Sequence, residues 1–283
     1  MTIKTVGIIG AGTMGNGIAQ VVAVAGLDAI VVDISESALQ KAVVSVSNSL
    51  GKLVAKGKLD ADTARVALSR IRTSVDYTSL TSADIVIEAA TENVDMKLAL
   101  LRKVEAIVPA DTVIATNTSS ISITALGAGL SDATRFIGMH FFNPVPLLPL
   151  VEIIRGLRTS AETTEKVRQL TMKLDKTPIA VRNSPGFVVN RILVPMINEA
   201  FFVLAEGVAS AEEIDGGMKL GANHPIGPLA LADLVGLDVC LSVLDVFARD
   251  FGDPKYRACP LLREMVCAGD LGRKTGKGVY TYS

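Results

Sequence analysis

The fold is decided by the stretch Val6-Gly7-Ile8-Ile9-Gly10-Ala11-Gly12-Thr13-Met14-Gly15-Asn16-Gly17-Ile18-Ala19-Gln20. A short apolar run is followed by three spaced glycines and then by a run that is compatible with a helix. A strand buried on both faces of a parallel sheet needs a continuous apolar segment, and a tight turn into a helix needs residues without side chains. Gly10 permits the sharp reversal, Gly12 leaves the main chain open to close approach, and Gly15 lets the helix pack near the strand. The stretch therefore predicts a strand, a tight turn and a helix.

A second apolar run, Ala29-Ile30-Val31-Val32, ends in Asp33. Any tight turn from strand to helix uses glycine, so the glycines alone are weak evidence, but strand, glycines, helix, strand and acid in this order are specific. The N–H groups and positive dipole end of the first helix would face phosphates. An acid at the end of the second strand accepts hydrogen bonds from the ribose hydroxyls of NAD and repels the 2′-phosphate of NADP. We predict an NAD site that includes Gly10, Gly12, Thr13, Met14, Gly15 and Asp33.

The bulk composition narrows the class of protein. The 283 residues are 49% hydrophobic and only 4% aromatic, which is typical of α/β enzymes with small aliphatic cores. The net charge of −1 and the lack of a basic block argue against a nucleic-acid partner. No apolar run approaches the length of a membrane span, and the first strand begins too early for a signal peptide. Three unevenly spaced cysteines fit neither a disulfide framework nor a metal site, so we expect a cytoplasmic protein without a metal.

Alternating strand and helix patterns continue after Asp33. The expected elements are helices at 35–57, 60–69, 95–108 and 161–174, and strands at 71–75, 85–87, 112–116, 135–142, 150–155 and 179–181. This alternation predicts a Rossmann-type, doubly wound α/β sheet, with ligands at the carboxyl ends of the strands. Turn residues at 183–186 predict a boundary between a dinucleotide-binding domain at 1–183 and a second domain at 184–283.

The second domain is expected to be entirely helical. Residues 187–205 are apolar on nearly all sides, with Pro195 inside as an expected kink, and helical patterns follow at 211–220, 229–251 and 261–268. A domain this small has too little interior to surround the first helix. We therefore expect a partner subunit, in a homodimer, to cover part of it.

The two histidines are the main candidates for acid–base chemistry. A hairpin centred on Pro146 would place His140 opposite Glu152, and a carboxylate at one imidazole nitrogen would leave the other to exchange a proton with an alcohol during hydride transfer. From the spacing alone, a cross-strand pair that merely satisfies a buried histidine is equally compatible. His224 lies in a turn-rich loop, where a loop or capping role is favoured over catalysis.

Other polar residues have two interpretations each. Asn117-Thr118-Ser119-Ser120 follows a buried strand and could contact the substrate oxygen or the nicotinamide, or could cap a helix that begins at Ile121. Asn190 is an odd polar group at the start of the apolar helix, which could also serve the interface. Lys52, Lys56, Lys58 and Arg65 form a basic cluster that fits a solvated helix face or a phosphate-bearing substrate.

The chain resembles the short-chain L-3-hydroxyacyl-CoA dehydrogenases over essentially its whole length, and within that family the bacterial enzymes that act on 3-hydroxybutyryl-CoA. Six motifs in order carry the resemblance: residues 10–19, Asn117-Thr118-Ser119-Ser120, His140-Phe141-Phe142-Asn143-Pro144, Asn183-Ser184-Pro185-Gly186-Phe187 with Asn190-Arg191, Pro225-Ile226-Gly227-Pro228 before residues 233–238, and Gly272-Arg273-Lys274-Thr275-Gly276-Lys277-Gly278. The sequence departs from the family pattern at Gly51 and Gly57, where larger and often charged residues are expected.

The resemblance implies a role for each matching residue. His140 would be the general base and Glu152 its orienting partner, while Ser119 and Asn190 would position the substrate oxygen and the imidazole ring. NAD contacts would come from Asp33, Glu92, Lys97, Asn117 and Lys274. Ser49 and Lys56 match the positions that hold coenzyme A, which favours the phosphate interpretation of the basic cluster, and the family is dimeric through its helical domain.

The resemblance thus implies the reversible NAD-dependent oxidation of a short (3S)-3-hydroxyacyl-CoA to the 3-ketoacyl-CoA. Two rival classes stay open at this point. One is a related dehydrogenase of a free hydroxy acid or sugar acid, and the other is a non-catalytic NAD-binding scaffold, against which the pairing of His140 with Glu152 argues.

Overall fold

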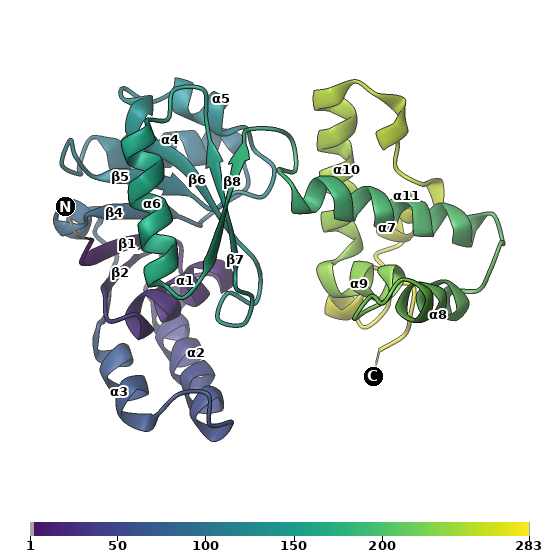
Figure 1. Cartoon of the computed structure of the whole chain (residues 1–283), viewed down its shortest axis with the longest axis horizontal. Coiled ribbons are helices and arrows are strands. Elements are labelled where there is room, and N and C mark those ends of the chain that lie inside the picture. The colour runs from purple at the N-terminus through teal and green to yellow at the C-terminus, as the bar shows by residue number, and fades with distance from the viewer. Residues whose placement is uncertain (1–2, 283) are drawn as a thin grey trace. The chain divides into compact units, whose positions relative to one another are not determined.

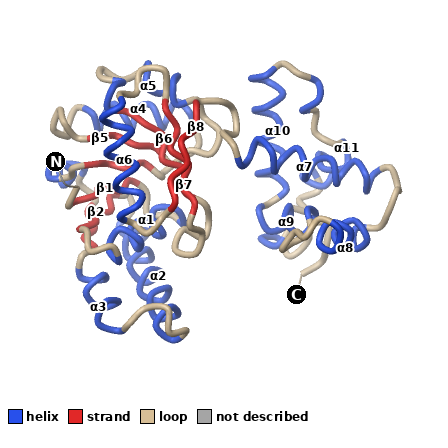
Figure 2. The backbone as a smooth tube through the Cα atoms, viewed as in Figure 1, coloured by secondary structure: helices blue, strands red, loops and turns tan. Residues whose placement is uncertain are grey.

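The computed structural model describes residues 3–282 and divides the chain into two compact units. The division falls between Asn183 and Ser184, and each unit has its own hydrophobic core. Unit 1 is built on a sheet and unit 2 on helices, as the red and blue segments of Figure 2 show.

Unit 1 holds one eight-stranded sheet in the order β3-β2-β1-β4-β5-β6-β7-β8. Neighbouring strands run parallel except β6 and β7, which are antiparallel. The central strand β4 is buried along its whole length, as expected for an apolar run with helices on both faces of a sheet. The strands are β1 (Thr5–Ile9), β2 (Asp28–Val32), β3 (Ile71–Ser74), β4 (Ile85–Glu88), β5 (Val113–Thr116), β6 (Phe136–Phe141), β7 (Leu150–Arg155) and β8 (Thr177–Arg182). The doubly wound α/β class predicted from the sequence is confirmed.

The helices of unit 1 follow the expected alternation. Side chains of α1 and α6 share one core with β1, β6 and β7, which fixes these helices on one face of the sheet. The helices are α1 (Thr13–Val24), α2 (Glu36–Ala55), α3 (Ala61–Ser69), α4 (Val94–Glu105), α5 (Ile123–Ala128) and α6 (Ala161–Lys173), with short 3-10 turns η1 (Tyr77–Ser82) and η2 (Ala133–Arg135).

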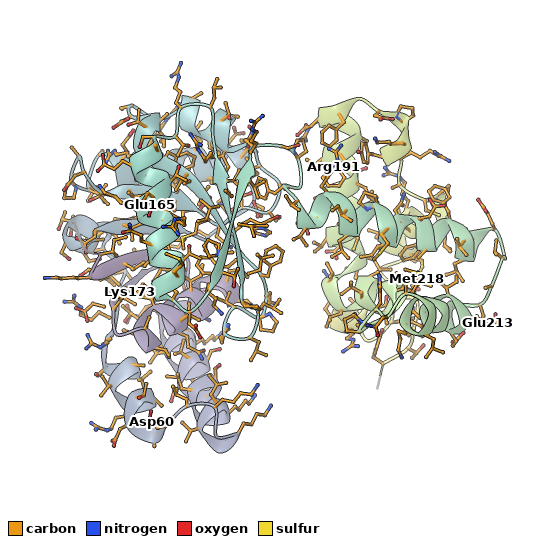
Figure 3. All side chains as sticks on the ribbon, in the orientation of Figure 1. Asp60, Glu165, Lys173, Arg191, Glu213 and Met218 are labelled. Atoms are coloured by element: carbon orange, nitrogen blue, oxygen red, sulfur yellow. The ribbon has the colours of Figure 1, made fainter. Side chains whose placement is uncertain are left out.

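Helices α2 and α3 form a pair that extends away from the sheet (Figure 1). Val46 and Leu50 of α2 pack with Ala67 of α3 in a small separate core. Ser35 caps α2 as expected, because its hydroxyl accepts the N–H of Ala38 at 3.2 Å. Asp60, labelled in Figure 3 near the far end of the pair, caps α3 by accepting the N–H of Thr63 at 2.7 Å.

Unit 2 is helical, apart from two isolated β-bridges near its C-terminal end, among the residues that the structure describes. Buried Val194, Ile197 and Phe201 of α7 pack into its core, whereas Ile192 on the same helix is 69% exposed. The elements are α7 (Val189–Ala205), α8 (Ala211–Gly221), α9 (Pro228–Val235), α10 (Leu237–Phe251) and α11 (Pro260–Cys267), with η3 (Pro254–Tyr256) and η4 (Arg273–Thr275).

Several expected elements have other bounds in the structure, and three of these differences have a local cause. The helix expected at 229–251 is split in two, because Gly236 has a φ of +106° and ends α9 before α10 begins. The helix expected from Phe187 begins at Val189, because Phe187 has a φ of +52°. The helix expected from Ile121 begins at Ile123, and its cap is Ser122, whose hydroxyl accepts the N–H of Ala125.

Within residues 3–282, no helix is both long and apolar enough to span a bilayer.

Candidate active site

The glycine turn is shaped as its sequence predicts. Gly10 has a φ of +103°, and a side chain there would collide with the backbone of Ala89 and Ala90. A Cβ on Gly15 would lie 1.8 Å from the carbonyl oxygen of Gly10, so the helix packs directly on the turn. A Cβ on Gly12 would meet nothing within 4 Å. Gly12 is also the N-cap of α1 and makes no side-chain cap, so the helix start is open to an anion.

Asp33 lies just past the end of β2 and braces this turn. One carboxylate oxygen accepts the N–H of Ala11 at 2.8 Å, and the other accepts the N–H of Ser35 at 3.0 Å. A carboxylate oxygen has two lone pairs, so these bonds leave acceptor capacity for ribose hydroxyls. The residues present thus fit a dinucleotide, with α1 at the phosphates and Asp33 at the ribose.

Glu88, the last residue of β4, binds the loop that follows it. One carboxylate oxygen accepts the N–H of Ala90 at 2.8 Å, and the other accepts the hydroxyl of Thr116 at 2.7 Å and an ion-pair hydrogen bond from Lys97. All three side chains are at most 1% exposed. A direct contact between Lys97 and NAD was expected from the sequence. In the structure, the ammonium group of Lys97 is instead buried against Glu88 and Thr116.

Glu92 and Asn117 tie neighbouring loops and strands together. The exposed Glu92 accepts the hydroxyl of Thr118 at 2.7 Å and the N–H of Ser119 at 3.0 Å. Asn117 follows β5, and its side-chain oxygen accepts the N–H of Phe141, the residue after His140, at 2.8 Å. The structure therefore brings Glu92 and Ser119 together, and it links Asn117 to the strand that carries His140.

His140 and Glu152 pair across the only antiparallel step of the sheet in the described chain. The register of β6 and β7 sets the two residues opposite each other, which confirms the hairpin predicted from the sequence. Nδ1 of His140 lies 2.8 Å from Oε2 of Glu152, with side chains that are 8% and 0% exposed. The ring of Phe142 packs against the imidazole at a centroid distance of 4.5 Å. The carboxylate fixes the tautomer that has its proton on Nδ1, so proton exchange with a substrate would pass through Nε2.

The expected coenzyme A residues lie on α2 and at its C-terminal end, where Lys56 is the cap residue. A surface hollow of about 660 Å³ runs along one face of this helix, lined by Ser37, Gln40, Lys41, Val44, Ser45, Asn48, Ser49 and Lys52. Ser49 is therefore part of the hollow. Lys56 is exposed one turn beyond Lys52, on the same side of the helix.

The candidates in unit 2 are described within that unit alone. Asn190 lies in the first turn of α7 and is half-buried, next to Arg191, whose guanidinium lies 3.6 Å from the centroid of the Phe251 ring (Figure 3). Nζ of Lys274, expected to contact NAD, binds both carboxylate oxygens of Asp238 at 2.5 and 2.6 Å. His224 lies in a loop, where its N–H donates to the carbonyl oxygen of Met218 at 3.2 Å.

Glu88 and Thr116 were not predicted from the sequence as residues of the site. A signal was present for Glu88, because it is an acid at the carboxyl end of an apolar strand, just as Asp33 is. Among residues 3–282, no group of three or more His, Cys, Asp or Glu side chains is placed to hold a metal ion.

A dinucleotide turn and a buried carboxylate–histidine pair on one doubly wound sheet define a nicotinamide-dependent dehydrogenase. The chain matches the NAD-binding domain of 3-hydroxyacyl-CoA dehydrogenase over residues 5–184 and the C-terminal domain of that enzyme over residues 186–282. It therefore belongs to the 3-hydroxyacyl-CoA dehydrogenase family, and its first domain binds NAD.

Full-length relatives agree with this assignment. The chain is 51% identical to a probable 3-hydroxybutyryl-CoA dehydrogenase of Deinococcus radiodurans, covering 98% of this chain and 99% of the relative. It is 48% identical to the 3-hydroxybutyryl-CoA dehydrogenase of Clostridioides difficile, with 98% of each chain covered. The crystal structure of (S)-3-hydroxybutyryl-CoA dehydrogenase from Ralstonia eutropha is similar over 100% of both chains, with 62% identity and a TM-score of 0.97.

Proposed function

We infer that this protein catalyses the reversible NAD-dependent oxidation of (3S)-3-hydroxybutyryl-CoA to acetoacetyl-CoA. The observation that carries the inference is the buried His140–Glu152 pair, because it supplies an oriented acid–base group in the domain that binds NAD. The substrate follows from the relatives, which cover the chain over nearly its whole length.

His140 accepts the proton of the substrate hydroxyl at Nε2 as the alcohol becomes a ketone. Glu152 stabilises the resulting imidazolium through its hydrogen bond to Nδ1, and in the reverse direction His140 returns the proton to the oxygen. NAD, when bound, takes the hydride from the hydroxyl-bearing carbon. Ser119 and Asn190 hold the substrate oxygen and orient the ring, and Glu92, Asn117 and Lys274 contact the cofactor.

Coenzyme A binds along the lysine-bearing face of α2. Ser49 lines the hollow on this face with Lys41 and Lys52, and Lys56 extends the row of positive charges. Ammonium groups in such a row attract the phosphates of the coenzyme handle. A free hydroxy acid has no handle that would use this face, so the face favours the CoA ester over the rival substrate class.

The helical unit serves the substrate and dimerisation. Ile192 of α7 is 69% exposed, as is fitting for a residue that a second subunit covers. Sedimentation of the wild type is expected to give a dimer, and Ile192→Glu to shift the mass toward a monomer. The cytoplasmic location expected from the cysteines stays a prediction.

A kinetic series tests the proposed reaction. Oxidation of NADH is measured with 3-ketoacyl-CoAs of increasing chain length, with NADPH in parallel and with acetoacetate as the free acid. We expect the highest kcat/KM for acetoacetyl-CoA with NADH. Faster turnover of acetoacetate would favour the free-acid dehydrogenase, and NADH binding without turnover of any ketone would favour the scaffold.

A further inference from the structure

We propose that Glu88 is a positioning residue for the dinucleotide site, held in place by Thr116 and Lys97. It would fix the position of the glycine turn through the loop that follows β4, without touching cofactor or substrate. The proposal rests on the proposed function only in that the bound cofactor is NAD or NADH.

The carboxylate of Glu88 supplies hydrogen bonds that the loop after β4 would otherwise lack. Its Oε1 accepts the N–H of Ala90 at 2.8 Å and that of Thr91 at 3.4 Å, so the carboxylate turns the chain sharply as it leaves the strand. The loop is also tied to β1, because the N–H of Ala89 donates to the carbonyl oxygen of Ile9 at 2.8 Å. Both contacts direct the loop toward the first residue of the glycine turn.

The loop and the glycine turn lie in direct contact. A Cβ built on Gly10 would be 2.7 Å from the carbonyl oxygen of Ala89 and 2.8 Å from the Cα of Ala90. The same loop ends in Glu92, which binds Thr118 and Ser119. A shift of residues 89–92 would therefore displace the glycine turn on one side and the Ser119 segment on the other.

Thr116 and Lys97 hold Glu88 from the opposite side. The Thr116 hydroxyl donates to Oε2 at 2.7 Å, and Nζ of Lys97 lies within hydrogen-bond distance of both Oε2 and that hydroxyl. Glu88 and Thr116 are 0% exposed, so neither can reach a ligand. A buried carboxylate requires a compensating charge, and the ammonium of Lys97 supplies it. The acid therefore acts on the loop with a fixed charge and a fixed orientation.

Thr116→Val and Thr112→Val form a matched pair of variants. Thr116 is the last residue of β5 and Thr112 directly precedes that strand, and both are buried. The Thr112 hydroxyl, however, donates to the carbonyl oxygen of Ala83 at the opposite end of the strand. We expect Thr116→Val to raise the Kd for NADH, measured by the fluorescence of the bound nucleotide, by about threefold to tenfold. We expect Thr112→Val and Thr116→Val to lower Tm by similar amounts, but Thr112→Val to leave the NADH Kd unchanged. Equal NADH Kd values for the two variants would overturn the proposal.

Glu88→Gln gives a second, independent measurement. We expect it to raise the NADH Kd by about tenfold or more, and to raise the KM for NADH more than that for acetoacetyl-CoA. Because Thr116 acts through Glu88, adding Thr116→Val to Glu88→Gln should raise the Kd little further. Full additivity of the two substitutions would show that Thr116 does not act through the carboxylate, and would also overturn the proposal.

These titrations contain no ketone substrate, so they separate this proposal from the proposed reaction. If the wild type binds NADH without reducing acetoacetyl-CoA, the reaction fails, and the Thr116 and Thr112 comparison still decides the role of Glu88. If the wild type reduces acetoacetyl-CoA and the two threonine variants bind NADH equally, the reaction stands and the role of Glu88 fails.

Discussion

Oε2 of Glu152 lies 2.8 Å from Nδ1 of His140, across a register that sets these two residues opposite each other in β6 and β7. Both side chains are almost fully buried, so water cannot take the place of the carboxylate. The pair therefore fixes the orientation of the imidazole before any substrate arrives.

Glu152→Gln should lower kcat for reduction of acetoacetyl-CoA by about 10² to 10⁴, because the neutral amide neither stabilises the imidazolium nor enforces the tautomer. The Kd for NADH should stay within about twofold of the wild-type value, since the dinucleotide turn is untouched. Stopped-flow reduction and an NADH titration check both statements. His140→Ala should give an equal or larger loss, and wild-type turnover in either variant would sink the acid–base assignment.

Gly12→Ala and Gly15→Ala should separate a glycine needed by the ligand from one needed by the fold. Gly12 has a φ of −77° and open space at its Cβ position, so alanine fits and should leave Tm unchanged or slightly raised. Its methyl group would occupy the approach to the phosphates, and the NADH Kd should rise by about tenfold or more.

Gly15→Ala should in contrast lower both stability and affinity. Its Cβ would lie 1.8 Å from the Gly10 carbonyl oxygen, and overpacking of this kind costs about 1–3 kcal/mol of the free energy of unfolding. Thermal unfolding of both variants, with and without NADH, is the measurement. Equal values of Tm for the two variants would contradict this division of roles.

Local patterns in the sequence were enough to predict the sheet and the pairing of His140 with Glu152 across it. The hairpin register followed from the loop around Pro146 because a short connection between two strands leaves few alternatives, and His140 therefore met Glu152. Helix ends were harder to predict. Gly236 inside an otherwise helical pattern is usually tolerated, and only its φ of +106° beside Asp238 and Lys274 reveals the break.

The buried charges could not be predicted from local patterns at all. Lys97 lies on α4, whose sequence gives no sign that this lysine turns inward while Lys103 on the same helix stays exposed. Its burial depends on Glu88 and Thr116, which come from two neighbouring strands of the sheet. Such a pairing is a tertiary contact between segments far apart in the chain, and a periodic pattern carries no information on it.

Asp33→Asn should relax the preference for NADH over NADPH. The carboxylate accepts hydrogen bonds from the N–H groups of Ala11 and Ser35, and its remaining lone pairs can accept hydrogen bonds from ribose hydroxyls. Loss of the charge removes both the attraction for the 2′-hydroxyl and the repulsion of a 2′-phosphate. The ratio of kcat/KM with NADH to that with NADPH should fall by about 10- to 100-fold. Glu36 is exposed nearby, so Glu36→Gln removes a charge of the same sign and should leave the ratio unaltered. If Asp33→Asn also left the ratio unaltered, the ribose would be recognised elsewhere.

Lys56→Ala should weaken binding of the CoA substrate alone. Its ammonium is exposed on the face of α2 that carries Ser49, so the KM for acetoacetyl-CoA should rise by about fivefold to twentyfold, and less at high salt because of screening. The KM for NADH should not change. Lys4→Ala, at the opposite end of the sheet from the strand carboxyl ends, is the matched control. A parallel rise of both KM values would instead indicate a general loss of structure.

The three cysteines should differ sharply in reactivity toward iodoacetamide at pH 8. Cys267 is exposed, whereas Cys240 and Cys259 are fully buried. Burial raises the pKa of Cys240 from 9.0 to about 12, so only about one thiol in 10⁴ is ionised at this pH, and the thiolate is the reactive form.

Mass spectrometry of the native protein should therefore find one adduct per chain, at Cys267, and three after denaturation. Cys267→Ser should give none in the native state, and rapid native labelling of Cys240 would contradict its burial. The raised pKa also makes the free energy of unfolding depend on pH, because between pH 9 and 12 the folded state retains a proton that the unfolded state has lost. The contribution of Cys240 to the free energy of unfolding is complete below pH 9 and declines as the pH rises toward 12, and denaturant titrations of the wild type and Cys240→Ala at pH 8 and pH 10 should show this difference.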